Sequence, residues 1–180
     1  MPQDRSMIQK LLNKLESNRA EICQVLAALT EEEFTKVPVD GGWSVSQVVN
    51  HLISAETGTS IYISKKIQGG KNLKDTGVKN QLNATALKLA LKSNKRFKAP
   101  SVLPVPSNRS KEKSLKDWDK TREALNDLFI SLDPSLYKKE IFRHPVAGYL
   151  NAEQTLHFIN DHMNHHEKQI IRIIQSFENV

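Results

Sequence analysis

Two histidines one helical turn apart stand near the end of the chain. His162 and His166 are four residues apart within the segment 151–176, NAEQTLHFINDHMNHHEKQIIRIIQS. On an α-helix this spacing puts both side chains on one face, so both imidazoles can reach a common point. Such a pair is a frequent way to grip a metal ion, although an inward histidine can equally be a hydrogen-bonded core residue. A third inward ligand would favour the metal interpretation.

The same segment predicts an amphipathic helix that faces a core. Its apolar residues recur at steps of three and four, which places them on one helical stripe. The stripe consists of Ala152, Leu156, Ile159, Met163, Ile170, Ile173 and Ile174. His162 and His166 lie at its flank and centre, whereas His157 and His165 point away from it. We therefore expect only the first two to look inward.

A third inward histidine, His51, is predicted on another helix. That helix starts after Ser44, which can form a capping box with Gln47, and continues to about residue 68. His51 lies close to the apolar stripe of this helix. Glu56 falls on the stripe itself, where an unpaired carboxylate is unfavourable. We therefore expect it either to lie shielded at the helix flank or to pair with a partner such as a ligand histidine or Arg122. Glu56 is thus a candidate for supporting the metal ligands.

Length, charge and cysteine content restrict the class of protein. The 180 residues predict one domain, 1–180, and the single cysteine, Cys23, excludes an intrachain disulfide. No apolar run is long enough to span a bilayer and the N-terminal residues lack a signal peptide's apolar centre, so we expect a cytoplasmic protein without a membrane partner. The net charge of +6 comes without a nucleic-acid-binding signature, so we expect no nucleic-acid partner.

Two further long helices are predicted from the same periodicity. The first covers about 6–29, and the other begins near Ser110 or Ser114 and ends before Asp133 and Pro134. Residues 30–34 begin a short turn with capping-box spacing between Thr30 and Glu33. Residues 136–150 are predicted as a loop, and Asn151 with Gln154 as the cap of the last helix.

Residues 69–113 form the least regular part of the chain. We predict a short helix at about 84–97, followed by the proline-containing loop KAPSVLPVPSNRS. The segment is either a lid or wall of a pocket or a passive crossover. Four long amphipathic helices without an alternating strand pattern predict an all-α four-helix bundle with a long crossover between helices two and three. Bundles of this kind place metal sites between facing helices.

Two segments resemble a known family. WSVSQVVNHL (43–52), followed more than a hundred residues later by HPVAGYLNAEQTLHFINDHMNHHEKQI (144–170), is similar to the DinB-like superfamily, also called the YfiT-like group of metal-dependent hydrolases. The resemblance implies a DinB/YfiT-type bundle with His51, His162 and His166 as metal ligands. The family motif has a tryptophan and a serine that open the second helix, a histidine on that helix, and HxxxH followed by xxQI on the last helix. HEKQI at 166–170 fits the ending of this motif, whereas His165 does not fit its register.

The resemblance also implies a chemistry. Three neutral imidazoles would hold a divalent cation, zinc or nickel in the first place, with a coordination position open for water or substrate. The two activities implied are hydrolysis and S-transfer with a low-molecular-weight thiol such as bacillithiol or mycothiol, in the bacterial cytoplasm and with a small-molecule substrate. A homodimer is also compatible with this expectation.

Several alternatives stay open at the level of sequence. His144 is either an acid, a base, a fourth ligand or an exposed loop histidine, and Trp43 is expected to pack at the entrance of its helix. Asp161 and Glu167 point elsewhere on the helical wheel and are not expected to be ligands. No nucleophile or general base is evident, so catalytic residues are not assigned. The alternative function is a non-catalytic binding or dimerisation module with a vestigial or structural histidine cluster.

Overall fold

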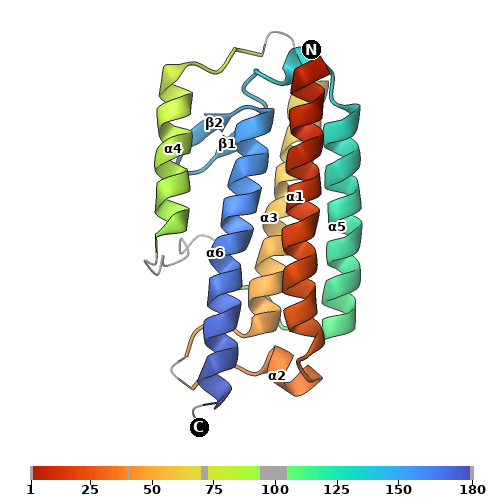
Figure 1. Ribbon diagram of the computed structural model, residues 1–180, viewed down its shortest axis with the longest axis vertical. Helices are drawn as coiled ribbons and strands as arrows, with labels where there is room; N and C mark the ends of the chain where they lie inside the picture. The colour runs from red at the N-terminus through yellow and green to blue at the C-terminus, as the bar shows by residue number, and fades with distance from the viewer. Residues whose placement is uncertain (1, 40, 70–72, 94–104, 179–180) are drawn as a thin grey trace.

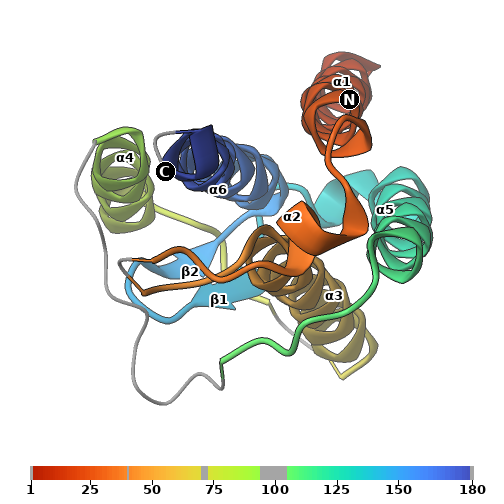
Figure 2. The same cartoon turned by 90° about the horizontal axis from the view of Figure 1, so that it is seen from below.

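Four long helices lie side by side along the molecule (Figure 1). The computed structural model describes residues 2–39, 41–69, 73–93 and 105–178. The four helices are α1 (Pro2–Ala27), α3 (Val45–Gln68), α5 (Lys111–Ser131) and α6 (Ala152–Glu178). α1 packs against α6 and α5, and α3 packs against the same two helices, which closes the group seen from its end in Figure 2. The predicted all-α four-helix bundle is confirmed.

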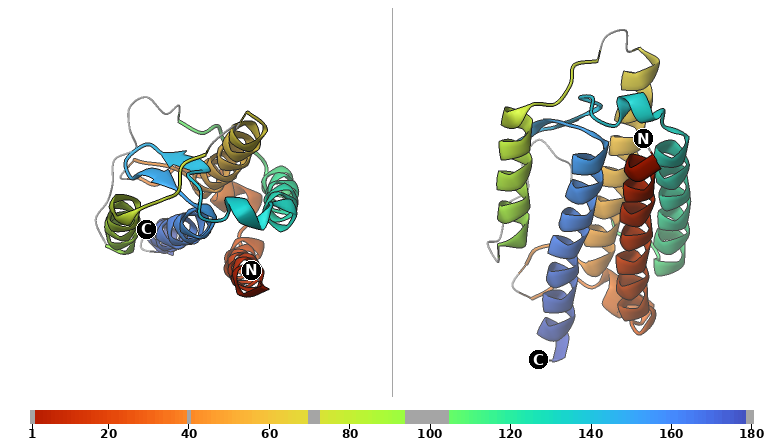
Figure 3. Two further views of the ribbon diagram at one scale, coloured as in Figure 1. Left: turned by 90° about the horizontal axis from the view of Figure 1, so that it is seen from above. Right: turned by 45° about the horizontal axis from the view of Figure 1, so that its top comes forward.

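The chain direction explains the long crossover. In Figure 1 α3 and α5 both run upward, whereas α1 and α6 run downward. Because α3 and α5 are parallel, the chain must return along the molecule between them. The helix α4 (Val78–Lys92) makes this return outside the group of four, beside α6, as both views in Figure 3 also show. The crossover between the second and third long helices is therefore part of the fold.

The crossover helix was predicted with the wrong bounds. It begins at Val78 instead of residue 84 and ends at Lys92, and residues 94–104 lie outside the described part of the chain. Its first turn was missed because its inward side chains are polar. Asn80 donates to the carbonyl oxygen of Tyr149 at 2.9 Å and Asn83 to that of Ala147 at 3.1 Å. Such amides dock a helix on a backbone without leaving an apolar stripe in the sequence.

Residues 136–150 are not a plain loop, which corrects the sequence prediction. A 3-10 turn at Pro134–Leu136 is followed by the antiparallel strands β1 (Phe142–His144) and β2 (Gly148–Leu150). Three-residue strands are too short to show an alternating pattern. The turn between them needs Gly148, whose φ of +73° lies in the left-handed region that glycine adopts without strain. The expected absence of strands is therefore wrong for this hairpin.

The predicted helix caps are present. Ser44 and Gln47 form a reciprocal capping box at α3, and Thr30 and Glu33 form one at α2 (Glu31–Thr35). At α6 the backbone N–H of Asn151 donates to Gln154, whose own N–H donates to the Asn151 side chain at 2.9 Å. These hydrogen bonds fix where each helix begins, and hence which residues of α3 and α6 face each other.

The apolar stripes of the four helices meet in one core. The stripe predicted on α6 is buried, with Ile174 partly so. The largest side chains that are almost fully buried include Trp118, Phe129, Leu15, Leu52 and Leu156. Among the described residues, no helix combines the length and the apolar character needed to cross a membrane.

Candidate metal centre

Three histidines from two helices converge between α3 and α6. The Nε2 atom of His162 lies 3.2 Å from the Nε2 atom of His51 and 3.2 Å from that of His166. One ligand atom from each of the three residues lies within 4.8 Å of the others. The structure thus brings together the three residues that the sequence singled out.

These separations suit a common metal ion. Two imidazole nitrogens that each lie about 2.0–2.1 Å from one cation are separated by about 2.8–3.4 Å when the angle between them is octahedral or tetrahedral. The observed 3.2 Å falls in this range for both pairs that include His162. The donor set consequently fits a divalent cation of the zinc or nickel type.

Helix geometry explains why the rings meet. His51 is in the second turn of α3, and its neighbour Leu52 is buried in the core with 1% of its surface exposed. On α6, Met163 is fully buried beside His162, and His166 follows one turn later with 9% exposed. Buried neighbours lock the rotation of each helix, so the inward face of α6 presents both rings to α3.

Burial keeps the three rings neutral. It lowers the pKa of His51, lowers that of His162 well below its usual value, and lowers that of His166 to about 3. Any positive charge on one ring lowers the pKa of the next, as His166 does for His162 and His51 does for His166. Neutral imidazole is the form that binds metal, so these rings are ready to coordinate at neutral pH.

Gln169 orients one of the ligands. Its Oε1 lies 2.8 Å from Nδ1 of His166. An amide oxygen only accepts, so this contact places the His166 proton on Nδ1 and leaves the Nε2 lone pair directed at the other two rings. The residue belongs to the motif quoted from the sequence, but its hydrogen bond was not predicted.

Two aromatic rings flank the triad. The ring of Trp43 lies 5.2 Å from that of His51, and the ring of Phe158 stacks 5.4 Å from that of His162. Trp43 therefore packs at the start of its helix, as expected, and also contacts a candidate ligand. Phe158 was missed, although its i, i+4 relation to His162 could have revealed it. Aromatic ring surface thus lies beside His51 and His162.

His144 also contacts the Phe158 ring. It ends strand β1, and its ring meets that of Phe158 edge-on at 4.6 Å. Its Nδ1 accepts the backbone N–H groups of Val146 and Ala147, at 3.2 and 3.0 Å. Burial lowers its pKa to about 4. His144 is not one of the three converging ligands, and it is only partly exposed.

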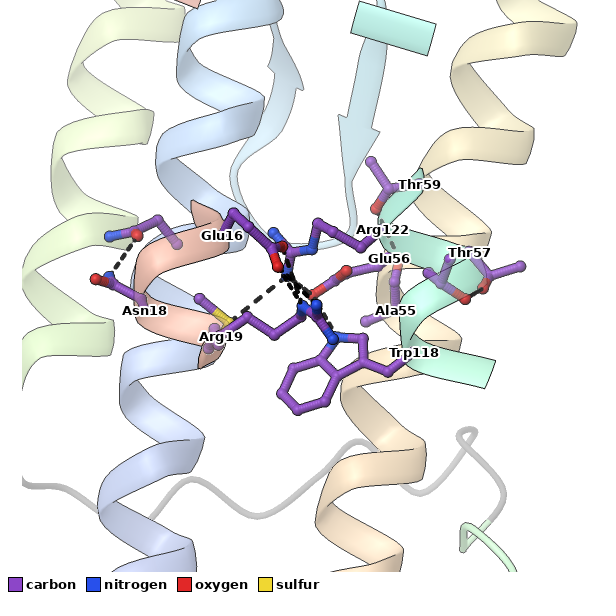
Figure 4. A network of polar contacts seen from close by, with 12 residues as sticks. Glu16, Asn18, Arg19, Ala55, Glu56, Thr57, Thr59, Trp118 and Arg122 are labelled. Atoms are coloured by element: carbon purple, nitrogen blue, oxygen red, sulfur yellow. Dashed lines mark hydrogen bonds and ion pairs between the residues drawn. The ribbon is translucent and has the colours of Figure 1, made fainter. Parts of the chain in front are cut away.

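Glu56 pairs with Arg122, the second of the two partners expected from the sequence. Arg122 on α5 donates to Oε1 of Glu56 at 2.8 Å, and both side chains are almost completely buried. Figure 4 shows the two side chains pointing toward each other, with Trp118 and Arg19 beside them. Burial raises the pKa of Glu56, although the Arg122 charge opposes the shift. No hydrogen bond joins Glu56 to His51, His162 or His166, all of which are described.

The remaining histidines and acids of α6 lie elsewhere. His165 faces the crossover helix, where its Nδ1 lies 3.0 Å from the carbonyl oxygen of Leu91, and His157 is partly exposed beside Glu153. Asp161 and Glu167 are not part of the group of ligands. These positions agree with the helical wheel drawn from the sequence.

The loop expected to border the site is described only in part. Residues 98–104 lie outside the described residues. The part that follows is tied to the start of α3, because Gln47 donates to the carbonyl oxygen of Pro106 and Ser46 to that of Arg109. Two surface hollows lie beside the N-terminal part of α1, and the triad lines neither.

The fold and the triad define a class of protein: a helical bundle with a three-histidine site, suited to a metal ion, between two of its long helices. The chain belongs to the DinB superfamily, whose sequence profile matches residues 14–170.

Solved structures share this fold. YfiT from Bacillus subtilis, described as a probable metal-dependent hydrolase with an unusual four-helix bundle topology, is 21% identical with a TM-score of 0.60, over 95% of this chain and 87% of its own. TT2238, described as a four-helix bundle protein, is 18% identical with a TM-score of 0.58, over 92% of this chain and 98% of its own. A search of curated protein sequences found no match.

Proposed function

We propose that this protein is a divalent-metal-dependent enzyme that acts on a small molecule, either as a hydrolase or as a thiol S-transferase. The observation that carries the proposal is the convergence of three neutral Nε2 atoms, with 3.2 Å between those of His162 and each of its two partners. His51, His162 and His166 would hold the cation. Three protein ligands leave at least one coordination position for a further molecule, as in catalytic zinc sites.

The donor set indicates what the cation contributes. When bound, it would act as a Lewis acid that polarises an oxygen or lowers the pKa of a coordinated water or thiol. Around it, Gln169 keeps the His166 proton on Nδ1, and the rings of Trp43 and Phe158 supply apolar surface and limit access of water. Apolar walls with few polar groups suit a small organic substrate.

Charge supports an anionic ligand at the open position. The strongest electrostatic influences on His162 and His166 come from other histidines and Arg172, and not from a carboxylate. A divalent cation held by neutral imidazoles therefore keeps its full charge, which favours a thiolate or another anion. This observation supports S-transfer, while the description of YfiT supports hydrolysis.

Metal content tests the site directly. Purified protein, loaded with Zn²⁺ or Ni²⁺ and passed through a desalting column, is expected to retain about one ion per chain. The variants His51→Ala, His162→Ala and His166→Ala should each lose it, whereas His157→Ala and His165→Ala serve as matched controls and should retain it. An unmodified protein that retains no ion after incubation with either metal would refute the proposal.

Activity then separates the two chemistries. The loaded protein is assayed with activated esters and amides alone, and with an electrophilic acceptor plus cysteine or bacillithiol. Metal-dependent turnover without thiol indicates a hydrolase, and turnover that needs the thiol indicates an S-transferase. A loaded protein inactive in both screens would leave the alternative function, a binding module with a structural histidine cluster.

A further inference from the structure

The hairpin beside the triad carries a polar group that the metal ligands do not use. We propose that His144 is a substrate-binding residue of the candidate metal centre, a fixed hydrogen-bond donor whose Nε2–H meets an oxygen acceptor on the bound molecule. The inference rests on the proposed function, since it requires a molecule bound at the triad. It also narrows the substrate class to molecules with a carbonyl or similar oxygen some bonds away from the metal-binding atom.

The backbone of the hairpin sets the tautomer of His144. The N–H groups of Val146 and Ala147 both donate to its Nδ1, at 3.2 and 3.0 Å. A nitrogen that accepts a hydrogen bond carries a lone pair, and a neutral imidazole has only one N–H, which is therefore at Nε2. Both donors lie in the short turn between β1 and β2, two and three residues after His144.

The ring is also held in its neutral state. Burial lowers the pKa of His144 to about 4. Protonation at Nδ1 would in addition break both backbone hydrogen bonds, because two donors would then face a third. At neutral pH His144 is thus a neutral hydrogen-bond donor with its proton on Nε2, and not a cation that attracts anions.

The position of His144 suits a contact with a molecule bound at the triad. His144 and His162 lie against the same Phe158 ring, with centroid distances of 4.6 and 5.4 Å, so they can be no further apart than these two distances together. Within the described residues, Nε2 of His144 has no hydrogen-bond partner, which leaves its N–H available. A molecule of a few bonds can span this separation.

Nitrogen-15 NMR of the metal-free protein tests the tautomer first. Two-bond proton–nitrogen correlations distinguish a protonated Nε2 from a protonated Nδ1. For His144 we expect the Nε2–H form throughout the range from pH 6 to 8. A protonated Nδ1, or a mixture of both forms, would overturn the inference whether or not the protein binds metal.

Ligand affinity then tests the contact. Nickel-loaded protein is titrated by calorimetry with N,N-dimethyl amides of mercapto acids of increasing chain length, and with alkanethiols of the same lengths. These amides carry an acceptor oxygen and no donor. At the best length we expect the amide to bind about threefold to tenfold more tightly than the matched alkanethiol, the size of one hydrogen bond.

Variants assign this preference to His144. His144→Phe keeps a ring against Phe158 and should lose the preference, whereas His144→Gln, which offers an amide N–H at a similar reach, should keep part of it. His157→Phe, at a partly exposed position on α6 that is not one of the three ligands, is the control and should retain the whole preference. Equal affinity for both probes in the unmodified protein, or an unchanged preference in His144→Phe, would overturn the inference. A protein that retains neither nickel nor zinc would instead refute the proposed function and this inference with it.

Discussion

Nδ1 of His166 lies 2.8 Å from Oε1 of Gln169, three residues further along the same helix. The contact therefore depends only on α6 remaining helical. It fixes the tautomer of the ligand and the rotation of its ring before a cation arrives. Supporting contacts of this kind typically contribute tenfold to a hundredfold to metal affinity.

Replacing Gln169 should weaken metal binding without unfolding the protein. Gln169→Met preserves the shape of the side chain but removes the acceptor, so we expect the dissociation constant for Zn²⁺ to rise by about 10- to 100-fold. Competition with a chromophoric chelator measures this change. Lys168→Gln, at the exposed neighbouring position, is the control. An unchanged affinity in Gln169→Met would show that the hydrogen bond does not organise the site.

The metal-free protein should lose stability as the pH falls below about 6.5. The pKa values of His162 and His166 are lowered in the folded protein, so between pH 6.5 and the folded values the unfolded chain binds more protons. Each such group lowers the free energy of unfolding by up to about 1.4 kcal/mol per pH unit. Urea unfolding at pH 7.5, 6.5, 5.5 and 5.0 measures the dependence.

The contribution of His166 can be isolated by difference. Its folded pKa of about 3 means that it should stay neutral over the whole of this range. The slope of the free energy of unfolding against pH gives the number of protons that the chain takes up on unfolding. In His166→Gln this number should be smaller by close to one than in the unmodified protein, because all other groups are common to both. Parallel slopes would mean that His166 becomes protonated in the folded state.

Fluorescence should report metal binding through one tryptophan. Trp43 lies 5.2 Å from His51, whereas Trp118 is buried beside Glu56 in the charged network. Ni²⁺ has an open d shell and quenches the fluorescence of nearby indoles, so titration with Ni²⁺ should lower the tryptophan fluorescence of the protein. Zn²⁺ has a filled d shell and should not quench the fluorescence in this way. Trp118→Phe should keep most of the quenching and Trp43→Phe should lose most of it. The opposite pattern would place the bound ion away from His51.

The sequence predicted best those parts of the fold in which local signals agree. α6 has an uninterrupted apolar stripe together with the Asn151 cap, and its inward histidines follow from the same periodicity. α4 was misplaced because Asn80 and Asn83 occupy its inner face, where a periodicity argument expects apolar residues. The hairpin was missed because its strands are three residues long.

In the candidate site, too, the sequence predicted the contacts within one helix better than the contacts that depend on the backbone of a turn. The pairing of His162 with His166 is a property of one helix, but the approach of His51 depends on how α3 rotates against α6, which the apolar stripes indicated. The backbone contacts of His144 depend on the form of the turn between β1 and β2. No spacing rule predicts such contacts, because they join a side chain to the returning backbone of a hairpin.

Glu56 either supports the metal ligands or stabilises the helix bundle. Its ion pair with Arg122 joins α3 to α5, and Arg122 also contacts the sulfur of Met163, the neighbour of His162. Breaking a buried pair by removing one partner leaves an uncompensated charge, which usually costs about 3–5 kcal/mol. Exposed pairs contribute far less.

Glu56→Gln should therefore lower the free energy of unfolding by about 3–5 kcal/mol and leave the metal stoichiometry of the folded protein unchanged. The double variant Glu56→Gln with Arg122→Met should recover part of this loss, because it removes the charge left unpaired. Asp119→Asn, which breaks the more exposed pair with Arg19, is the control and should cost less than about 1 kcal/mol. If Glu56→Gln kept its stability but no longer retained metal, Glu56 would be acting on the ligands, which was one of the expectations from the sequence. Loss of stability with full metal retention assigns Glu56 to the bundle.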